Sequence, residues 1–321
     1  MMPVWLQVIA VFCPALTSFF MGIALIPFLK NYFKLNLKST ADSESCVCPT
    51  MCGVLLLFGT ITGLVLSFAL YQQFSGADRT GITFQTESRT VCTVLGYSLL
   101  MGFVGLFQDN FKIRSVIHKN KKNLMDPERK LWQFLVAFLM SMVFIRMLPA
   151  EIRNAGVFGN FPDIVNALLL AGFWQLMQFP EQETDGISVT MGMIQFLCLS
   201  MLFLAQKQNL CAIFSFSAAG ASMGCLFWNL HPAKCRLGQV GTFWFGAAVP
   251  ALCLMTQKVT VFGLYLAVYV LNFLPALLRK FQKQQFMILL QNAGCKPGQR
   301  IAILSGSALF CCALAIITQI K

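Results

Sequence analysis

Long apolar stretches alternate with short polar segments along the whole chain. Most approach the roughly 20 residues that an α-helix needs to cross the hydrocarbon layer of a bilayer. The pattern predicts ten membrane-spanning helices, at residues 4–28, 49–72, 90–107, 131–149, 162–179, 188–205, 210–228, 241–255, 259–278 and 301–319. The stretch 241–255 shows the pattern most weakly.

No internal repeat and no long Gly/Ser or Pro linker interrupts this alternation. The prediction is therefore an all-α polytopic membrane protein that forms a single integral membrane domain over residues 1–321. The first apolar stretch has no basic segment before it and no small-residue cleavage site, so we expect it to remain as a span and not to be a removable signal peptide.

The composition agrees with a membrane protein. Of the 321 residues, 57% are hydrophobic and 11% are charged, whereas roughly a quarter of the residues in soluble proteins are charged. So few charged side chains cannot cover an apolar core with a polar surface, which excludes a water-soluble globule. The net charge of +12 lies mainly in the connecting loops, so we expect no nucleic-acid partner.

The positions of the basic residues predict the orientation in the membrane. Five alternate loops, at residues 29–48, 108–130, 180–187, 229–240 and 279–300, carry 17 of the 24 Lys and Arg residues. Basic loops stay on the cytoplasmic side, so these five are predicted to be cytoplasmic. Ten spans then place both termini on the extracytoplasmic side. The same loops can attract anionic lipid head groups.

Most of the 13 cysteines lie in or beside apolar stretches, where a thiol behaves as a small hydrophobic group. We therefore interpret them as reduced. Cys46, Cys48 and Cys52 form the closest group on the polar side, but no second pair or histidine follows at the spacing of a zinc site.

Polar side chains gather at four places near the predicted cytoplasmic ends of spans. These are Cys48-Pro49-Thr50-Met51-Cys52-Gly53, the segment from Gly105 to Lys112, the acidic group Glu181-Gln182-Glu183-Thr184-Asp185-Gly186, and the segment from Asn229 to Thr242. Any one of them could be an ordinary interfacial loop in which an acidic residue only caps a helix.

Together and in this order, the four segments resemble motifs of the MraY family, within the wider polyprenyl-phosphate phospho-sugar transferases. Cys48–Gly53 is similar to PTMGG, and Gly105–Lys112 is similar to GFxDDxxK. Thr184–Gly186 is similar to the core of NLTDGLDG, and Pro232–Thr242 to PAxVFMGDTGS. The resemblance covers approximately residues 20–315.

The resemblance implies a function in peptidoglycan synthesis in the bacterial cytoplasmic (inner) membrane. The family transfers phospho-MurNAc-pentapeptide from UDP to undecaprenyl phosphate and depends on Mg²⁺. The partners implied are undecaprenyl phosphate, a UDP-linked sugar and membrane lipids, and a homodimer is compatible with the sequence.

Carried over by residue, the resemblance implies catalytic roles for Asp109, Lys112 and Asp185, with the two aspartates as metal ligands. It implies substrate binding by Gln182, Gly238 and Gly241. Three positions where the family has Asp hold Gln108, Ser188 and Gln239. The place of a family His triplet holds Met287-Ile288-Leu289, and the two histidines, His118 and His231, lie elsewhere.

These replacements bear on catalysis because Mg²⁺ favours carboxylate oxygens. Gln keeps a carbonyl oxygen without the charge, and Ser has no carboxylate. A charge about 4 Å from a cation contributes on the order of 4 kcal/mol per unit charge at an effective dielectric constant near 20. Two hypotheses follow: Glu181 or Glu183 supplies a displaced carboxylate and transfer is retained, or the chain is a catalytically inactive lipid- or partner-binding relative.

A lipid transporter is the alternative from another class, and it would need ionisable residues near the middle of the membrane. The main candidates, Arg146 and Asp163, fall near span ends, where snorkelling explains them. Gly220 and Gly224 have the GxxxG spacing of closely packed helices. A purely structural partner of another membrane subunit also stays open.

A shared site requires Asp109 and Asp185 to converge although they are 76 residues apart. We predict a cytoplasm-facing cleft, built from the second to the ninth spans, in which the two carboxyl groups lie within about 10 Å, a reach that one hydrated Mg²⁺ could bridge. Gln108 and Gln239 are predicted to border the same cleft.

Overall fold

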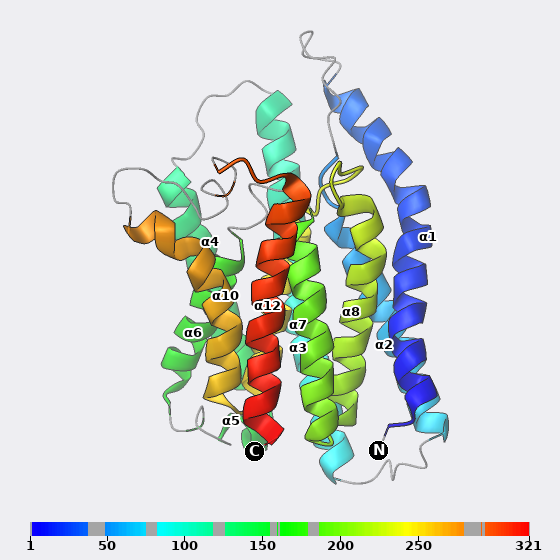
Figure 1. The fold of residues 1–321 in the computed structure, drawn as a ribbon, viewed down its shortest axis with the longest axis vertical. Helices are drawn as coiled ribbons and strands as arrows, with labels where there is room; N and C mark the ends of the chain where they lie inside the picture. The colour runs from blue at the N-terminus through cyan, green and yellow to red at the C-terminus, as the bar shows by residue number, and fades with distance from the viewer. Residues whose placement is uncertain are drawn as a thin grey trace.

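In the computed structural model, every regular element of the described part of the chain is a helix (Figure 1). The residues described are 2–37, 49–74, 82–117, 126–154, 159, 161–178, 186–278, 290 and 293–320. The helices are α1 (Val4–Leu37), α2 (Gly53–Phe74), α3 (Ile82–Ile117), α4 (Asp126–Met147), α5 (Ala150–Arg153), α6 (Asp163–Met177), α7 (Ile187–Ala205), α8 (Asn209–Asn229), α9 (Gly238–Met255), α10 (Val259–Leu278) and α12 (Pro297–Ile320).

Eight of these helices are long and apolar enough to cross a membrane: α1, α2, α3, α4, α7, α8, α9 and α12. The helix α6 and the apolar part of α10, Val259–Leu271, are shorter. These ten helices coincide with the ten apolar stretches of the sequence, which confirms the polytopic all-α prediction. The segment 241–255 lies in α9. The short helix α5 was not predicted.

Two helices extend well beyond their apolar stretches. Helix α1 continues to Leu37 and helix α3 continues to Ile117. The predicted starts of two loops, at residues 29 and 108, were therefore wrong, because the first residues of both loops are helical. Hydropathy measures preference for lipid, whereas polar residues such as Lys, Gln and Arg also favour helix in water. Consequently Gln108 and Asp109 stand on a helix and not in a loop.

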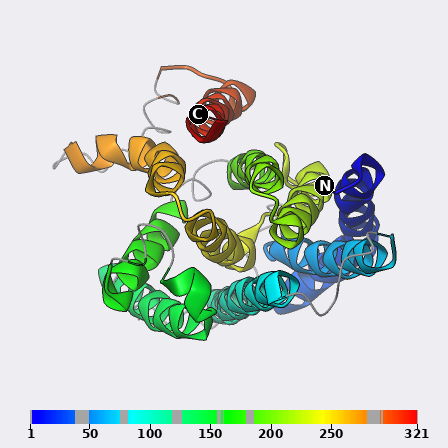
Figure 2. The ribbon, with the colours of Figure 1, turned by 90° about the horizontal axis from the view of Figure 1, so that it is seen from below.

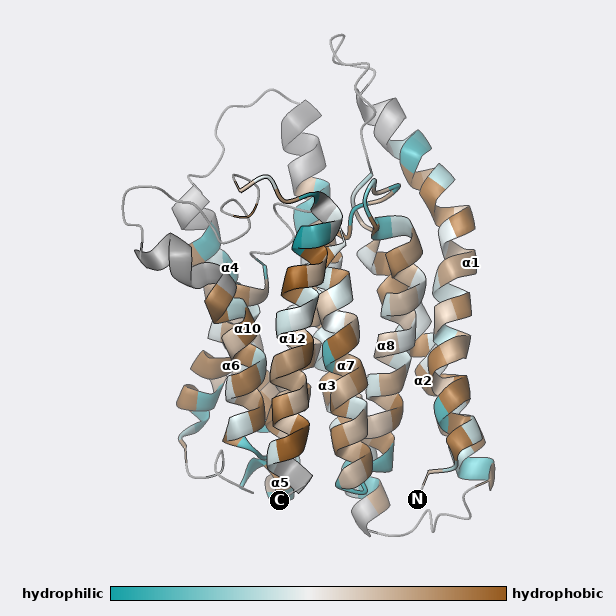
Figure 3. Ribbon diagram, in the orientation of Figure 1, coloured by the Kyte–Doolittle hydropathy of each residue, from teal (hydrophilic) through white to brown (hydrophobic). Residues whose placement is uncertain are grey.

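Helix α9 lies near the centre of the bundle, where α2, α3, α6, α7 and α10 pack against it (Figure 2). The most apolar stretch of α9 is 89% buried, whereas the corresponding stretches of α1, α4 and α12 are each 28% buried. Apolar residues cover the helix shafts, and hydrophilic residues concentrate near the helix ends (Figure 3). The outer helices thus present apolar side chains to lipid, and α9 is almost entirely enclosed by protein.

Glycines allow close contact between α1 and α8. A Cβ atom on Gly220 would collide with the backbone oxygen of Val11, and a Cβ atom on Gly224 with that of Ala15. This confirms that the two glycines serve helix packing. Beside them, the hydroxyl of Ser18 donates a hydrogen bond to the backbone oxygen of Leu55 on α2 at 3.0 Å.

We expect Gly220→Ala to lower the stability of the protein, because the added methyl group meets a backbone atom and the helices must separate. Overpacking of this kind costs typically about 1–3 kcal/mol. Thermal unfolding in detergent measures the effect. Gly263→Ala on α10 is the matched control, since a Cβ atom there has no neighbour within 4 Å; an equal loss in both variants would contradict the packing role.

Both chain termini lie at the same end of the bundle, together with α5 (Figure 1). This placement agrees with an even number of spans. The side of the membrane that this end faces follows from the distribution of Lys and Arg and stays a prediction.

Cysteines introduced at Lys121 and Lys283 are expected to react with a membrane-impermeant reagent added from the cytoplasmic side, because both positions lie in basic loops. Cysteines at Ala77 and Asn154 should react only from the opposite side. Labelling in right-side-out and inverted vesicles, with accessible native thiols first blocked, measures the accessibility. Labelling of positions 121 and 77 from one side would refute the ten-span topology.

Candidate functional site

The described parts of the polar motifs meet at the end of the bundle opposite the termini. The connection between α8 and α9 lies at this end (Figure 1). It contacts the residues that precede α2 and, through the start of α9, one side chain of α3.

The side chain of Asp109 on α3 holds the first turn of α9. Its Oδ2 accepts hydrogen bonds from the backbone N–H of Gln239 at 2.9 Å and of Val240 at 3.3 Å, and the residue is 3% exposed. The first N–H groups of a helix have no partner within the helix and carry partial positive charge, so a carboxylate there is stabilised. Asp109 therefore caps α9 from a neighbouring helix.

Gly238 makes this approach sterically feasible. It has φ +74°, and a Cβ atom there would lie 2.5 Å from Oδ2 of Asp109 and 2.8 Å from the backbone nitrogen of Met51. Gly105 of α3 also packs directly against the backbone of Gln239. Small residues thus bring α3 and the start of α9 into backbone contact.

The residues before α2 pair with the α8–α9 connection through three backbone hydrogen bonds. Arg236 N–H donates to the oxygen of Pro49 at 2.8 Å, Cys52 N–H to that of Arg236 at 3.0 Å, and Gly53 N–H to that of Leu237 at 2.9 Å. Gly241, predicted to bind substrate, packs here against Gly53, where there is no room for a Cβ atom. The first and fourth motifs are therefore one structural unit.

Asn229, to which the sequence analysis gave no role, links this unit to α7. Its Oδ1 accepts a hydrogen bond from Gly186 N–H at 3.0 Å, and its Nδ2 donates to the backbone oxygen of Cys235 at 3.1 Å. The side chain is buried. Gly186, at φ +85°, immediately precedes α7. The position of Asn229 at the start of the fourth motif segment was the signal that the sequence offered.

The three positions at which the resembling family has Asp carry neutral groups in distinct settings. The Oε1 of Gln108 accepts a hydrogen bond from Nε2 of Gln133 on α4 at 2.6 Å, and Gln133 is buried. Within the described residues, Ser188 Oγ and Gln239 Oε1 are buried without a hydrogen-bond partner. Uncharged groups therefore occupy all three positions.

Several predicted site residues lie outside the described part of the chain: Glu181, Gln182, Glu183, Asp185, Met287, Ile288, Leu289, His118, Cys46 and Cys48. The backbone of Lys112 belongs to α3, but its side chain is outside the described set. The separation of Asp109 and Asp185 therefore stays a prediction, as does the cleft. Gly186, which follows Asp185 in the sequence, donates its N–H to Asn229 at the end of α8. The α8–α9 connection then leads to Gln239 and Val240, which donate to Asp109.

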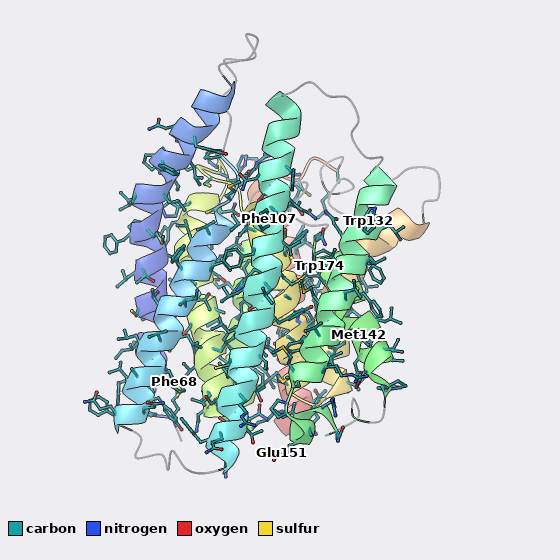
Figure 4. The ribbon with its side chains drawn as sticks, turned by 180° about the vertical axis from the view of Figure 1, so that it is seen from behind. Phe68, Phe107, Trp132, Met142, Glu151 and Trp174 are labelled. Atoms are coloured by element: carbon teal, nitrogen blue, oxygen red, sulfur yellow. The ribbon has the colours of Figure 1, made fainter. Side chains whose placement is uncertain are left out.

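The acidic side chains that the structure describes are Glu87, Asp109, Glu151 and Asp163. Only Asp109 lies at this end, since Glu87 accepts a hydrogen bond from Leu210 N–H at the start of α8 and Glu151 lies at the opposite end (Figure 4). The described residues contain no group of three or more His, Cys, Asp or Glu that could hold a metal ion. The described part of the site offers one carboxylate, Asp109, whereas Mg²⁺ is usually held by one or two carboxylates together with waters and phosphates.

Arg146 and Asp163, the candidates for a transport pathway, pair with each other. Nε of Arg146 lies 2.8 Å from Oδ2 of Asp163, and the Arg146 side chain is 68% exposed. One residue is at the end of α4 and the other is at the start of α6. An exposed ion pair at helix ends is an interfacial feature and offers a transport pathway no support.

The outer surface beside Asp109 is apolar. Phe107 on α3 and Trp132 on α4 point outward at a similar level (Figure 4), and both are exposed. Asp109 follows Phe107 by two residues and points into the bundle. The carboxylate thus lies behind a lipid-facing layer.

We expect Asp109→Ala to destabilise the protein by about 1–2 kcal/mol, the range of a lost helix cap. Asp109→Asn should cost less, because an amide oxygen can still accept from the N–H groups of α9. Thermal unfolding measures both variants. The exposed carboxylate of Glu151 supplies the control Glu151→Ala, and a similar small effect in all three variants would rule out the capping role.

Comparison with known proteins places this geometry in context. Residues 91–257, more than half of the chain, match the family described as "Glycosyl transferase family 4". The chain is 23% identical over 275 residues to the phospho-N-acetylmuramoyl-pentapeptide-transferase of Bacillus licheniformis, which covers 82% of this chain and 79% of the relative. It is 25% identical over 289 residues to that of Carboxydothermus hydrogenoformans, covering 82% of each protein. The transferase of Bacillus subtilis is 25% identical over 274 residues, covering 82% of this chain and 79% of the relative.

Proposed function

Because the chain belongs to glycosyl transferase family 4, we propose that it is an integral membrane protein that binds a polyprenyl phosphate and a UDP-linked sugar at the Asp109–α9 site without efficient phospho-sugar transfer. The relatives are named for phospho-N-acetylmuramoyl-pentapeptide transfer, so peptidoglycan synthesis is the setting we propose. The bacterial inner membrane is the location that follows.

One observation carries this proposal: the described carboxylate at the site, Asp109, is already engaged by two backbone N–H groups of α9. Its family partners are replaced by neutral side chains, and Gln108 is committed to Gln133. A diphosphate substrate carries negative charge, which Mg²⁺ offsets in the family when carboxylates hold it. With fewer carboxylates, the site loses much of the attraction that keeps such an ion in place.

The chain's own residues still suit a phosphate-bearing lipid. The start of α9 and the Gly238 turn fix the site on a rigid, buried helix. Lys112 follows Asp109 by one turn of α3 and can bind a phosphate as a point charge. A polyprenyl chain gains roughly 25 cal/mol per Å² of apolar surface buried. Binding is therefore retained more easily than turnover.

Retained transfer is the second candidate, and one contact favours it. Gly186, which directly follows the acidic segment 181–185 in the sequence, donates its N–H to Asn229 at the end of α8 at 3.0 Å. Asp185 with Glu181 or Glu183 could then supply the missing carboxylates. In this case Asp109 and Asp185 would hold the metal ion.

The assay that separates the two candidates is UMP release from UDP-MurNAc-pentapeptide with undecaprenyl phosphate and Mg²⁺. We expect release near background at every Mg²⁺ concentration, with the Bacillus subtilis transferase as the active control. Undecaprenyl phosphate should nevertheless raise the thermal stability, because a ligand that binds only the folded state stabilises it. Absence of this stabilisation would contradict the proposed binding.

Turnover that falls in Asp109→Asn and Asp185→Asn would overturn the binding-only proposal in favour of retained transfer. Turnover indifferent to both substitutions would refute the site itself. The triple variant Gln108→Asp, Ser188→Asp, Gln239→Asp restores the family carboxylates and should raise release if the remaining geometry is intact. The residues at the place of the His triplet, 287–289, can still prevent this rescue.

A further inference from the structure

Three cysteines from three separate segments converge beside the candidate site. Cys52 precedes α2, Cys225 belongs to α8, and Cys235 lies in the α8–α9 connection; all three are fully buried. The Sγ atoms of Cys52 and Cys225 are 3.3 Å apart although the residues are separated by 173 positions. Cys225 Sγ also lies 3.8 Å from the backbone oxygen of Cys52.

Two of these thiols replace other residues of the motifs that the chain resembles. Cys52 stands at the first Gly of PTMGG, and Cys235 stands at the Val of PAxVFMGDTGS. The two replacements lie on segments joined by the hydrogen bond from Cys52 N–H to Arg236. A hydrogen bond with Cys52, together with burial, raises the pKa of the Cys235 thiol. The contact with Cys52 and burial thus disfavour the thiolate form of Cys235.

We propose that Cys52 and Cys225 form an oxidisable thiol pair, which a small peroxide converts into a disulfide between the start of α2 and helix α8. This proposal is independent of the transfer activity. Because both sulfur atoms are buried, the oxidant must be small and uncharged to reach them, as hydrogen peroxide is. A bulky charged disulfide such as oxidised glutathione is excluded by size.

The reaction balances in two steps. The sulfur of Cys52 attacks the O–O bond of hydrogen peroxide, which gives a sulfenic acid and one water. The sulfur of Cys225 then displaces the hydroxyl group, which leaves as a second water when the S–S bond forms. Two sulfur atoms are oxidised by one electron each, the peroxide is reduced by two electrons, and both thiol protons end in water. The reaction should be slow, because both sulfur atoms are buried and the peroxide must reach them through packed protein.

The bridge would connect α8 covalently to the segment that pairs with residues 236 and 237. These residues lead directly into Gly238 and Gln239, the start of the capped helix. In the oxidised protein, the segment before α2 and the start of α9 would therefore be held more rigidly than in the reduced protein. A link across 173 residues also restricts the unfolded chain, so thermal stability should rise.

The experiment treats the full-length protein in detergent with hydrogen peroxide, in a background where Cys46 and Cys48 are replaced by serine. Peptide mass spectrometry should find a Cys52–Cys225 linked peptide that is lighter by two hydrogens than the sum of its parts. Thiol counting after denaturation should show a loss of two thiols per chain. Oxidised glutathione should produce no bridge.

Cys225→Ser and Cys52→Ser should each abolish both the linked peptide and the gain in thermal stability. Cys211→Ser, another buried cysteine of α8, is the matched control and should leave them unchanged. Size-exclusion profiles of the unoxidised variants verify folding. A bridge that uses Cys235, oxidation without a bridge, or a bridge formed equally well by oxidised glutathione would each overturn the proposal.

Discussion

The hydrogen bonds from the backbone of α9 to the Asp109 carboxylate are the interaction on which this end of the bundle depends. Helix α9 is the most enclosed of the eight described helices that are long enough to cross a membrane, and the first N–H groups of a helix have no partner within the helix. An unpaired buried donor and an unpaired buried charge are both costly, whereas together they compensate each other. One contact between α3 and α9 thus satisfies both requirements and fixes where α9 begins.

The other contacts of the site are arranged around this cap. The backbone pairing before α2 and the Asn229 side chain hold the α8–α9 connection from two further directions. Side chains that could be charged in an active transferase are neutral here, and one of them, Gln108, is committed to its own hydrogen bond with Gln133. Hydrogen bonds thus fix the start of α9, while neutral side chains stand at three positions where the resembled motifs carry Asp, which is why binding and turnover can be considered separately.

Hydropathy alone was sufficient to predict the ten apolar helices, eight of which are long enough to cross a membrane, because lipid imposes a nearly constant length and composition on a crossing helix. It failed at the ends of α1 and α3, where polar residues continue the helix outside the apolar region. The order of the motifs predicted that Asp109 and Gln239 would meet. It did not reveal that the Asp109 side chain accepts hydrogen bonds from the backbone of residues 239 and 240, because a motif records residue types and not hydrogen-bond partners.

The thiol cluster was also beyond prediction from the sequence. Adjacent cysteines at residues 46, 48 and 52 suggested a local group, whereas the neighbours of Cys52 come from α8 and from the α8–α9 connection. Only the tertiary packing of α2 against α8 selects the partner. Similarly, Gln133 gives no signal in the sequence, since its relation to Gln108 exists only where α3 and α4 lie side by side.

The backbone pairing between Pro49–Gly53 and residues 236–237 has a consequence for biogenesis. When α2 and α3 emerge during synthesis, the segments that bind Pro49 and Asp109 are still more than 100 residues away in the growing chain. The early helices must therefore reside in the membrane with this end incomplete until α8 and the start of α9 arrive. A chain interrupted before Gly238 would insert most of its spans and yet lack the N–H groups of Gln239 and Val240 that donate to Asp109, so membrane insertion and formation of the site are separate events in the life of this protein.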